Sequence, residues 1–530
     1  MKIQQSMGKE PVMNLIRKQY LIAAAVAGAL AFGSAYAQKP PAGGPPTPGF
    51  NTRIPSSVMT PDTVETRIGT LKFADGVPTH ETTQKLYDHL DFLRGVEAFL
   101  TFVPAASIEA MRRGAVEMGA TKSNQAVIFD NLLDSNPLFL TGNTDTVYCM
   151  AVLDLQTDGP TVVEVPPGSG PGTVNDAYFR FIVDMGFPGP DKGKGGKYLI
   201  VPAGYKGALP KEGYFVARST SSVQLLLLRG FLVDGKPDAA SKMFRTGLKI
   251  YPLSKAANPP AMQFFNGSKV AFNTVHANDF EFFRELDHVI QKEPIGFIDP
   301  ELRGLAAAIG IRKGRKFAPD ARMQKILVDA VAVGNATARA ISFYDRNPRA
   351  PLYKNSRWET LFPGVDYRWL EDGGAGGRNL DARLKYFYVA TLNTPAITSK
   401  LIDVGSKYAY ATLDKAGNPM DGAKNYRVNV PKNVPAKNFW SLVLYDPQTR
   451  SELQTSQPYP SKNDKRDKLI VNADGSVDLY IGPKAPAGKE ANWIASVPGK
   501  GWFALFRVYG PTEAWYDEKQ WRVGEIELVN

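Results

Sequence analysis

The chain has 530 residues, of which 43% are hydrophobic and 22% charged, a balance typical of globular proteins that excludes a largely disordered chain. Its length allows two or three domains. The formal net charge is +11, and the single cysteine, Cys149, excludes an internal disulfide, so stability must come from core packing.

The first residues have the pattern of a cleavable secretory signal. Arg17 and Lys18 precede an uncharged apolar run at 21–33, and the sequence AYA at 35–37 matches the small-x-small pattern of signal peptidase sites. The apolar run holds about 13 residues, whereas a membrane-spanning helix needs about 20. We therefore expect residues 1–37 to be a signal peptide, and the mature protein to be periplasmic or secreted without an integral membrane segment.

Helix-like and strand-like patterns alternate along the rest of the chain. Apolar residues recur at helical spacing over 82–104, and a second helix is expected at 105–119. Short alternating runs separated by turn residues follow between 147 and 228. Helical patterns dominate 279–343, and strand patterns return between 408 and 509. The order is thus β-rich, helical and β-rich, with each β-rich part an antiparallel sheet, sandwich or barrel.

These patterns suggest four segments in the mature chain. Residues 38–60 are rich in proline and glycine and predict an extended linker. An N-terminal β domain with leading helices is expected at 61–235, a mainly helical connector at 236–383 and a C-terminal β domain at 384–530.

Several segments in both β-rich parts carry a resemblance to a known family. They are LTGNTDTVYCMAVLDL at 140–155, VNDAYFRFIVDM at 174–185, YAYATLD at 408–414, FWSLVLYD at 439–446, NADGSVDLY at 472–480 and FALFRVY at 503–509. Together they resemble exported bacterial proteins that pair domain of unknown function 1254 with domain of unknown function 1214. The resemblance implies a β-rich α+β fold, with two antiparallel β-sandwich or jelly-roll-like domains joined by a helical segment. It carries over no established reaction.

Familiar catalytic motifs are absent from the sequence. There is no G-x-S-x-G elbow, no Walker A motif and no dinucleotide fingerprint. The four histidines show no metal-binding spacing. We expect no metal or other cofactor, although an oxygen-ligated divalent cation such as Ca²⁺ or Mg²⁺ stays open, since carboxylates and carbonyls suffice to bind it.

Carboxylates on the N-terminal strands are the candidate catalytic groups. Asp145 begins one predicted strand, and Asp176, Arg180 and Asp184 belong to another, where residues four apart face the same side. Two acids that share a pocket with an arginine could act as acid and base. The alternative is that Asn143 and Asp145 are turn residues and that Arg180 bridges two strands structurally.

Polar and aromatic residues near strand ends are the candidate ligand-binding groups. Asn143 and Tyr148 lie beside Asp145, and Arg507 and Tyr509 project from one face of a C-terminal strand. Aromatic side chains with an arginine can hold sugars or aromatic rings, although the same pattern occurs in an ordinary sandwich core. The remaining candidates are Trp440, Tyr445, Asn492 and Trp493.

Three functions fit these observations. The first is an exported protein that binds a small molecule in or between its β domains, with hydrolysis or acid–base chemistry by carboxylates as an extension. The second is a non-catalytic envelope protein that binds a ligand or glycan, and the third is a structural unit that forms homo-oligomers. A nucleic-acid partner is not expected at an exported address.

Overall fold

The computed structural model describes residues 54–529, so the predicted signal peptide and most of the predicted linker lie outside the described residues. Two compact units divide at Asp88 and His89. The first unit holds a small antiparallel sheet of β1 (Thr63–Thr66), β2 (Gly69–Ala74) and β3 (Val77–Pro78).

A single 38-residue helix, α2 (His80–Glu117), replaces the two helices expected at 82–104 and 105–119. Pro104 lies inside it and removes one backbone donor, which normally costs about 3 kcal/mol and ends or kinks a helix. The neighbouring Val103 and Ala105 are fully buried, so core packing compensates for the lost hydrogen bond.

Two packed sheets form the N-terminal β-rich part. In the first sheet all pairs are antiparallel except β13 with β4, and in the second sheet β10 pairs β9 in parallel. Buried residues from both sheets, including Cys149, form one cluster, so they pack as a sandwich with α4 (Asp238–Gly247) against it. The first sheet runs β13 (Gln263–Asn266), β4 (Gln125–Ile128), β5 (Thr146–Asp154), β11 (Val223–Phe231), β7 (Gly172–Asp176), β8 (Phe181–Met185); the second runs β10 (Phe215–Arg218), β9 (Gly196–Val201), β6 (Thr161–Val165), β12 (Lys249–Pro252).

Two further sheets form the C-terminal β-rich part. They are mainly antiparallel, with a parallel pair between β19 and β20, and no sheet closes into a barrel among the residues described. The larger one runs β14 (Ser406–Ala411), β21 (Gly501–Pro511), β17 (Ala436–Tyr445), β18 (Ser461–Asn463), with β15 (Met420–Asp421) also on β21; the smaller runs β20 (Trp493–Ala495), β19 (Val477–Gly482), β16 (Asn425–Val430), β22 (Glu527–Val529).

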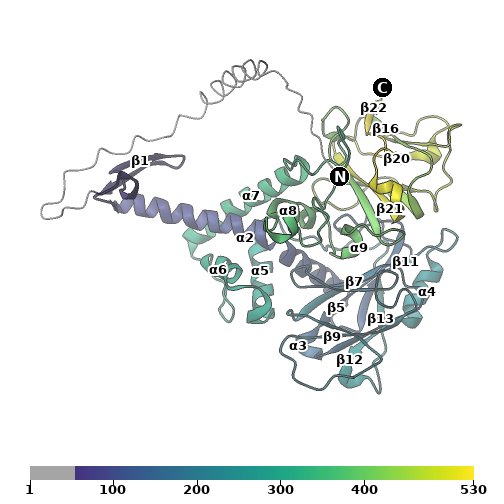
Figure 1. Cartoon of the computed structure of the whole chain (residues 1–530), viewed down its shortest axis with the longest axis horizontal. Helices are drawn as coiled ribbons and strands as arrows, with labels where there is room; N and C mark the ends of the chain where they lie inside the picture. Colours follow the sequence, from purple (N-terminus) through teal and green to yellow (C-terminus); the bar gives the residue numbers. More distant parts are fainter. Residues whose placement is uncertain (1–53, 530) are drawn as a thin grey trace, which may run out of the picture. The chain divides into compact units, whose positions relative to one another are not determined.

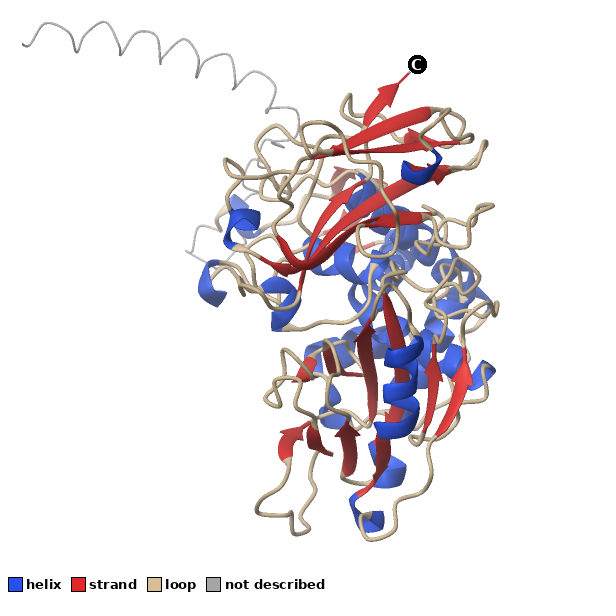
Figure 2. Ribbon diagram, turned by 90° about the vertical axis from the view of Figure 1, so that its right-hand side faces the viewer, coloured by secondary structure: helices blue, strands red, loops and turns tan. Residues whose placement is uncertain are grey.

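Helices lie between the two β-rich parts, as Figures 1 and 2 show, and make the fold a β-rich α+β protein as predicted. One buried cluster continues from α2 through these helices into the C-terminal sheets. The predicted domain boundaries at 235 and 383 stay predictions. These helices are α5 (Glu281–Lys292), α6 (Pro300–Ala308), α7 (Ala321–Phe343), α8 (Leu380–Val389) and α9 (Pro395–Thr398), whereas the short α3 (Leu155–Asp158) connects β5 to β6 within the N-terminal β-rich part.

Within residues 54–529, only α7 is long and apolar enough to span a membrane by length and composition. One third of its apolar window is buried, and the helix packs against α8. Core helices of soluble proteins have the same length and composition, so this helix is weak evidence for a membrane segment.

Candidate functional site

A loop at 141–145 connects the two β-rich parts through Asp145. The fully buried Asp145 carboxylate accepts hydrogen bonds from Ser441 Oγ at 2.5 Å, Asn463 Nδ2 at 3.0 Å and Tyr509 OH at 3.1 Å. Asn143 Oδ1 accepts the backbone N–H of Asp145 at 2.9 Å, the pattern of an Asx turn. Asp145 therefore lies in a turn, and apart from the neighbouring Thr144 hydroxyl its side-chain donors come from the C-terminal sheet.

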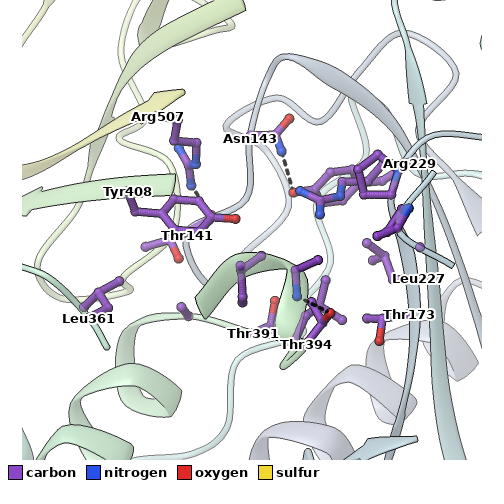
Figure 3. Close-up of a pocket in the computed structure, with 18 of the residues that line it drawn as sticks. Thr141, Asn143, Thr173, Leu227, Arg229, Leu361, Thr391, Thr394, Tyr408 and Arg507 are labelled. Carbon is purple, nitrogen blue, oxygen red and sulfur yellow. Dashed lines mark hydrogen bonds between the residues drawn. The ribbon is translucent and has the colours of Figure 1, made fainter. Parts of the chain in front are cut away.

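A cavity lies next to this loop, between the first N-terminal sheet and the larger C-terminal sheet (Figure 3). The cavity has a volume of about 50 Å³. This is room for a few water molecules or a ligand of similar size. Its polar lining residues are Thr141, Asn143, Tyr148, Thr173, Asp184, Arg229, Tyr386, Thr391, Thr394, Tyr408 and Arg507.

Strand alternation explains why these side chains share the cavity. On β11, Leu227 and Arg229 point to the face that does not pack against the second N-terminal sheet, and Arg229 pairs with Tyr148 on β5. On the next strands, Thr173 pairs with both Leu227 and Asp184. One face of this sheet thus packs as sandwich core, and the other face supplies half of the cavity.

Arg507 lies on the opposite side of the cavity, next to Tyr408, as Figure 3 shows. It is 3% exposed and donates hydrogen bonds to Tyr445 OH at 2.6 Å and to the carbonyl of Thr141 at 2.7 Å. Its guanidinium lies 5.7 Å from the ring centroid of Tyr408. All these neighbours are uncharged, so the positive charge of Arg507 is solvated by dipoles and an aromatic face.

Arg229 approaches the cavity from the N-terminal sheet (Figure 3). Its side chain interacts with the hydroxyl of Tyr408, and its Nε is buried without a hydrogen-bond partner. Among residues 54–529, no carboxylate lies within ion-pair distance of Arg229 or Arg507. Two buried guanidinium groups therefore face one cavity without a carboxylate in direct contact, and the acids that they influence, Asp184 and Glu452, act at longer range.

Asp184 is the only acidic residue in the lining. Burial raises the pKa of its carboxyl to about 6, while hydrogen bonds from Thr394 and Thr173 and the charge of Arg229 oppose the shift. The Thr394 hydroxyl reaches both carboxylate oxygens, at 2.6 and 2.7 Å. Asp184 can therefore gain or lose a proton near neutral pH.

Tyrosine hydroxyls complete the polar lining. Burial raises the pKa of Tyr148 to about 12, so its hydroxyl stays protonated, and it accepts Asn143 Nδ2 at 2.7 Å. Its own hydrogen is then free to point elsewhere. The Tyr386 hydroxyl instead donates to the carbonyl of Leu392 at 2.5 Å, which fixes the chain segment between α8 and α9.

The four catalytic candidates do not meet in one place. Asp176 forms an ion pair with Arg180 at 2.6 Å, and Arg180 precedes β8 instead of sharing that strand with Asp184. The reason is a tight turn between β7 and β8, where Phe179 has a φ of 53°. Asp145 is held by hydrogen bonds in the loop at 141–145, so of the four candidates only Asp184 faces the cavity between the sheets.

The ligand-binding candidates divide in a similar way. Asn143, Tyr148 and Arg507 line the cavity, Tyr445 holds Arg507, and Tyr509 holds Asp145. The other three lie elsewhere, because alternation along β17 turns Trp440 to the face opposite Arg507. Trp440 stacks on Phe506, Asn492 binds the backbone of Ile470 and Asp478, and the indole of Trp493 donates to Gly482.

The sequence did not single out several cavity residues, among them Arg229, Tyr386 and Tyr408. For Arg229 a signal existed, because it is the single charge in the mostly apolar strand VQLLLLRGF. A lone arginine in such a strand must meet a polar group or cavity when the strand is buried. Tyr386 and Tyr408 carry no comparable signal, since aromatic residues are common in cores.

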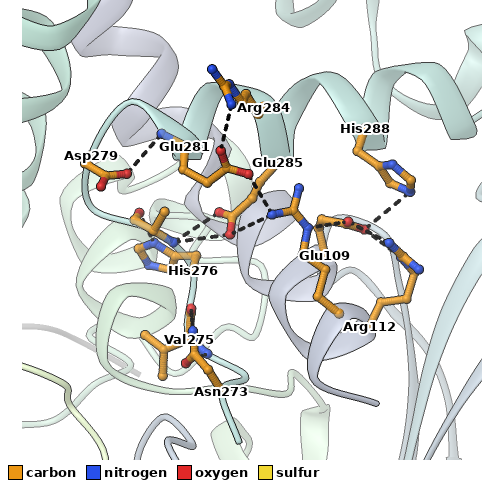
Figure 4. A network of polar contacts seen from close by, with 12 residues as sticks. Glu109, Arg112, Asn273, Val275, His276, Asp279, Glu281, Arg284, Glu285 and His288 are labelled. Carbon is orange, nitrogen blue, oxygen red and sulfur yellow. Dashed lines mark hydrogen bonds and ion pairs between the residues drawn. The ribbon is translucent and has the colours of Figure 1, made fainter. Parts of the chain in front are cut away.

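A second polar cluster, between α2 and α5, is held together by internal hydrogen bonds and ion pairs (Figure 4). Glu109 accepts hydrogen bonds from Arg113 at 2.9 Å, and Arg113 also binds Glu281 at 2.9 Å. Burial raises the pKa of Glu285 to about 8, and its carboxyl accepts the backbone N–H of Ala277. This network joins the two helices. No group of three or more His, Cys, Asp or Glu in the described part of the chain could hold a metal ion.

Comparisons with known families match both β-rich parts. Residues 123–252 match DUF1254 and residues 405–513 match DUF1214, each described as a protein of unknown function. This chain pairs a DUF1254 segment with a DUF1214 segment. The cavity lies between these segments: Arg229 and Asp184 belong to DUF1254, and Tyr408 and Arg507 belong to DUF1214.

Two solved structures were compared with the DUF1254–DUF1214 chain, and one of them resembles it in fold. The VPA0106 protein from Vibrio parahaemolyticus is 18% identical, with a TM-score of 0.50 over 83% of this chain and 100% of its own. An uncharacterized protein from Burkholderia cenocepacia is 12% identical, with a TM-score of 0.37 over 85% of this chain and 97% of its own. No curated protein matches the chain. The first likeness shows the fold alone.

Proposed function

We propose that this protein acts after export and binds a small anion in the cavity between its DUF1254 and DUF1214 segments. The observation that carries the proposal is the pair of buried arginines, Arg229 and Arg507, which face the cavity without a carboxylate partner. A buried charge without a counter-charge costs several kcal/mol. An anion bound between the two guanidinium groups would offset that cost.

The size and shape of the cavity favour a short-chain carboxylate. The cavity volume of about 50 Å³ suits a ligand of a few heavy atoms. A planar guanidinium matches a carboxylate with two parallel hydrogen bonds. Leu227, Leu361 and Leu505 also line the cavity and offer an apolar surface to a short hydrocarbon chain.

Acid–base catalysis is a second candidate, favoured by Asp184. Its carboxyl, with a pKa raised to about 6 by burial, lies on the wall of the same cavity as both arginines. A general acid or base works best with a pKa near the working pH. In this version the arginines hold the anionic group and Asp184 exchanges a proton with the rest of the ligand.

Glycan recognition has less support. It would need Trp440 and Trp493 as stacking residues. Trp440 packs against Phe506, and the indole of Trp493 donates to the carbonyl of Gly482. Neither lines the cavity between the two segments. A structural role without a ligand would leave the buried Nε of Arg229 without a hydrogen-bond partner.

The proposal is tested by titrating the mature protein with acetate, propionate and butyrate in a calorimeter. We expect saturable binding that Arg229→Gln and Arg507→Gln each weaken at least tenfold, about 1.4 kcal/mol. Arg346→Gln, which changes an arginine with an 87% exposed side chain outside the cavity, should bind as the wild type does. Circular dichroism checks that each variant folds. Equal binding by all variants, or no binding by the folded wild type, would refute the proposal.

Two further measurements separate its parts. Both hypotheses predict that Asp184→Asn retains anion binding. Only the acid–base hypothesis predicts that this variant also loses turnover. Export is tested by sequencing the N-terminus of the protein from the periplasm or medium. The signal pattern predicts that the mature chain begins at Gln38; an intact N-terminus in the cytoplasm would refute export.

A further inference from the structure

An open cleft lies on the other side of the segment that closes the cavity. Tyr386 and Thr394 line the cavity, whereas their chain neighbours Phe387 and Asn393 line the cleft. Asn175 fixes this wall, because its amide accepts the N–H of Asn393 at 2.9 Å and donates to its carbonyl at 2.7 Å. The cleft is therefore a separate space from the cavity between the sheets.

The cleft is large enough for a small organic molecule. The cleft has a volume of about 690 Å³, whereas the cavity has a volume of about 50 Å³. Known ligand sites have volumes of roughly 300–1,000 Å³. The walls come from the turn before β8, the start of α6, the loop before α8 and α8 itself.

Four arginines line this cleft, and two of them lack an acidic partner. Arg180 pairs with Asp176 at 2.6 Å, and Arg368 pairs with Asp366 at 2.9 Å. Within residues 54–529, no carboxylate lies within ion-pair distance of the other two, Arg378 and Arg383. Asp299 and Glu301 are the only acids in the lining, and the Asp299 side chain accepts the N–H of Leu302 as a helix cap.

The two unpaired arginines interact with an aromatic side chain and with the backbone. Arg383 lies 5.7 Å from the ring centroid of Tyr178, and Arg378 donates to the carbonyl of Arg368. Burial, and then the charge of Arg383, lower the pKa of Arg378. The two positive charges therefore repel each other weakly, and an anion between them would relieve that repulsion.

Flat aromatic surface accompanies these charges. Tyr367 and Phe181 line the cleft and meet edge to face at 5.7 Å between ring centroids. The guanidinium of Arg368 lies over Tyr367 at 5.4 Å. Such a surface stacks on planar rings and on guanidinium groups, whereas a bare inorganic anion would use none of it.

We propose that this cleft is a second binding site, which takes an aromatic carboxylate. Arg378 and Arg383 bind the carboxylate, and the ring lies against Tyr178, Phe181 and Tyr367. This site does not depend on the anion site between the DUF1254 and DUF1214 segments, because none of these residues lines that cavity.

The test is a titration of the mature protein with benzoate, followed by saturation-transfer NMR and calorimetry at constant ionic strength. We expect one saturable site that Arg378→Gln together with Arg383→Gln weakens at least tenfold. The single variant Arg378→Gln changes a residue that is exposed overall although its guanidinium is partly desolvated, and it serves if the double variant fails to fold. It should weaken binding severalfold. Arg346→Gln is the matched control and should bind benzoate as the wild type does.

Two additional arms make the outcome decisive. Benzyl alcohol, which lacks the charge, should bind at least tenfold more weakly than benzoate, and inorganic phosphate, which lacks the ring, should do the same. Arg229→Gln should leave benzoate binding unchanged. Unchanged binding by the Arg378 variants, phosphate binding as tight as benzoate, or loss of benzoate binding in Arg229→Gln would each overturn the proposal.

Discussion

The Asp145 carboxylate accepts a 2.5 Å hydrogen bond from the Ser441 hydroxyl, although 296 positions separate the two residues in the chain. Asp145 comes from the loop that precedes β5, and Ser441 from the middle of β17. This bond joins the DUF1254 segment to the DUF1214 segment beside the cavity. It therefore helps to fix the distance between the two sheets that carry Arg229 and Arg507.

Replacing Asp145 by alanine should destabilise the protein strongly. Ser441, Asn463 and Tyr509 would each lose a buried acceptor, at about 1–3 kcal/mol for each unsatisfied group, and the losses are not additive. We expect Asp145→Ala to lower the free energy of unfolding by about 3–5 kcal/mol in urea titrations. Asp145→Asn keeps one acceptor oxygen and should lose less. Equal stability of Asp145→Ala and the wild type would contradict this role.

The stability of the protein should depend on pH through Asp184. Its pKa is about 6 in the folded protein and near 3.8 when unfolded, so between these values the folded state binds the proton more tightly. The stabilisation is present below about pH 4 and is lost as the pH rises through about 6, a change of about 2–3 kcal/mol. The side chain of the Asp184→Asn variant cannot titrate. The free energy of unfolding of this variant minus that of the wild type should therefore increase by about 2–3 kcal/mol as the pH rises from about 4 to above 6. A constant difference would show that Asp184 has an ordinary pKa.

Cys149 should report global unfolding. Its thiol is buried in the N-terminal sandwich, and burial raises its pKa, so little thiolate forms. We expect no reaction with a thiol reagent in the native protein at mildly alkaline pH, and reaction of one thiol per chain in guanidinium chloride. Rapid labelling of the native protein would mean that the sandwich opens locally.

Two glycines with similar backbone angles should differ in their tolerance of alanine. Gly405 has a φ of 75°, and a Cβ there would lie 2.1 Å from the carbonyl oxygen of Ala396, which lines the cavity. Gly488 has a φ of 72° with nothing within 4 Å of the added atom. Gly488→Ala should cost about 1–2 kcal/mol, the left-handed penalty alone. Gly405→Ala should cost at least about 1 kcal/mol more because the backbone must also move. Thermal unfolding of both variants measures the difference, and equal losses would contradict the clash.

Local sequence predicted much of the fold but only part of the site. Alternating apolar residues predicted strands such as β5 and β21, because a strand exposes opposite faces at successive positions. The same alternation correctly put Arg507 and Tyr509 on one face. Trp440 was a further aromatic candidate, and the register of β17 against β21 turns its side chain away from them.

Pro104 shows where local rules fail. A proline usually ends a helix, so the sequence predicted two helices, and the structure has one. The burial of Val103 and Ala105 stabilises the continuous helix. The sequence around Pro104 does not predict this burial, because it depends on distant parts of the chain that pack against the helix.

The sequence by itself determined the order of β-rich and helical parts, the pairing of the two families and the turn at Asn143, since each depends on neighbours in the chain. Only the tertiary structure decided that Arg229 meets Arg507 across one cavity and that Arg180 pairs with Asp176 instead of joining Asp184. The physical reason is that periodicity shows which residues share a face of a sheet, whereas packing decides which distant sheet that face meets.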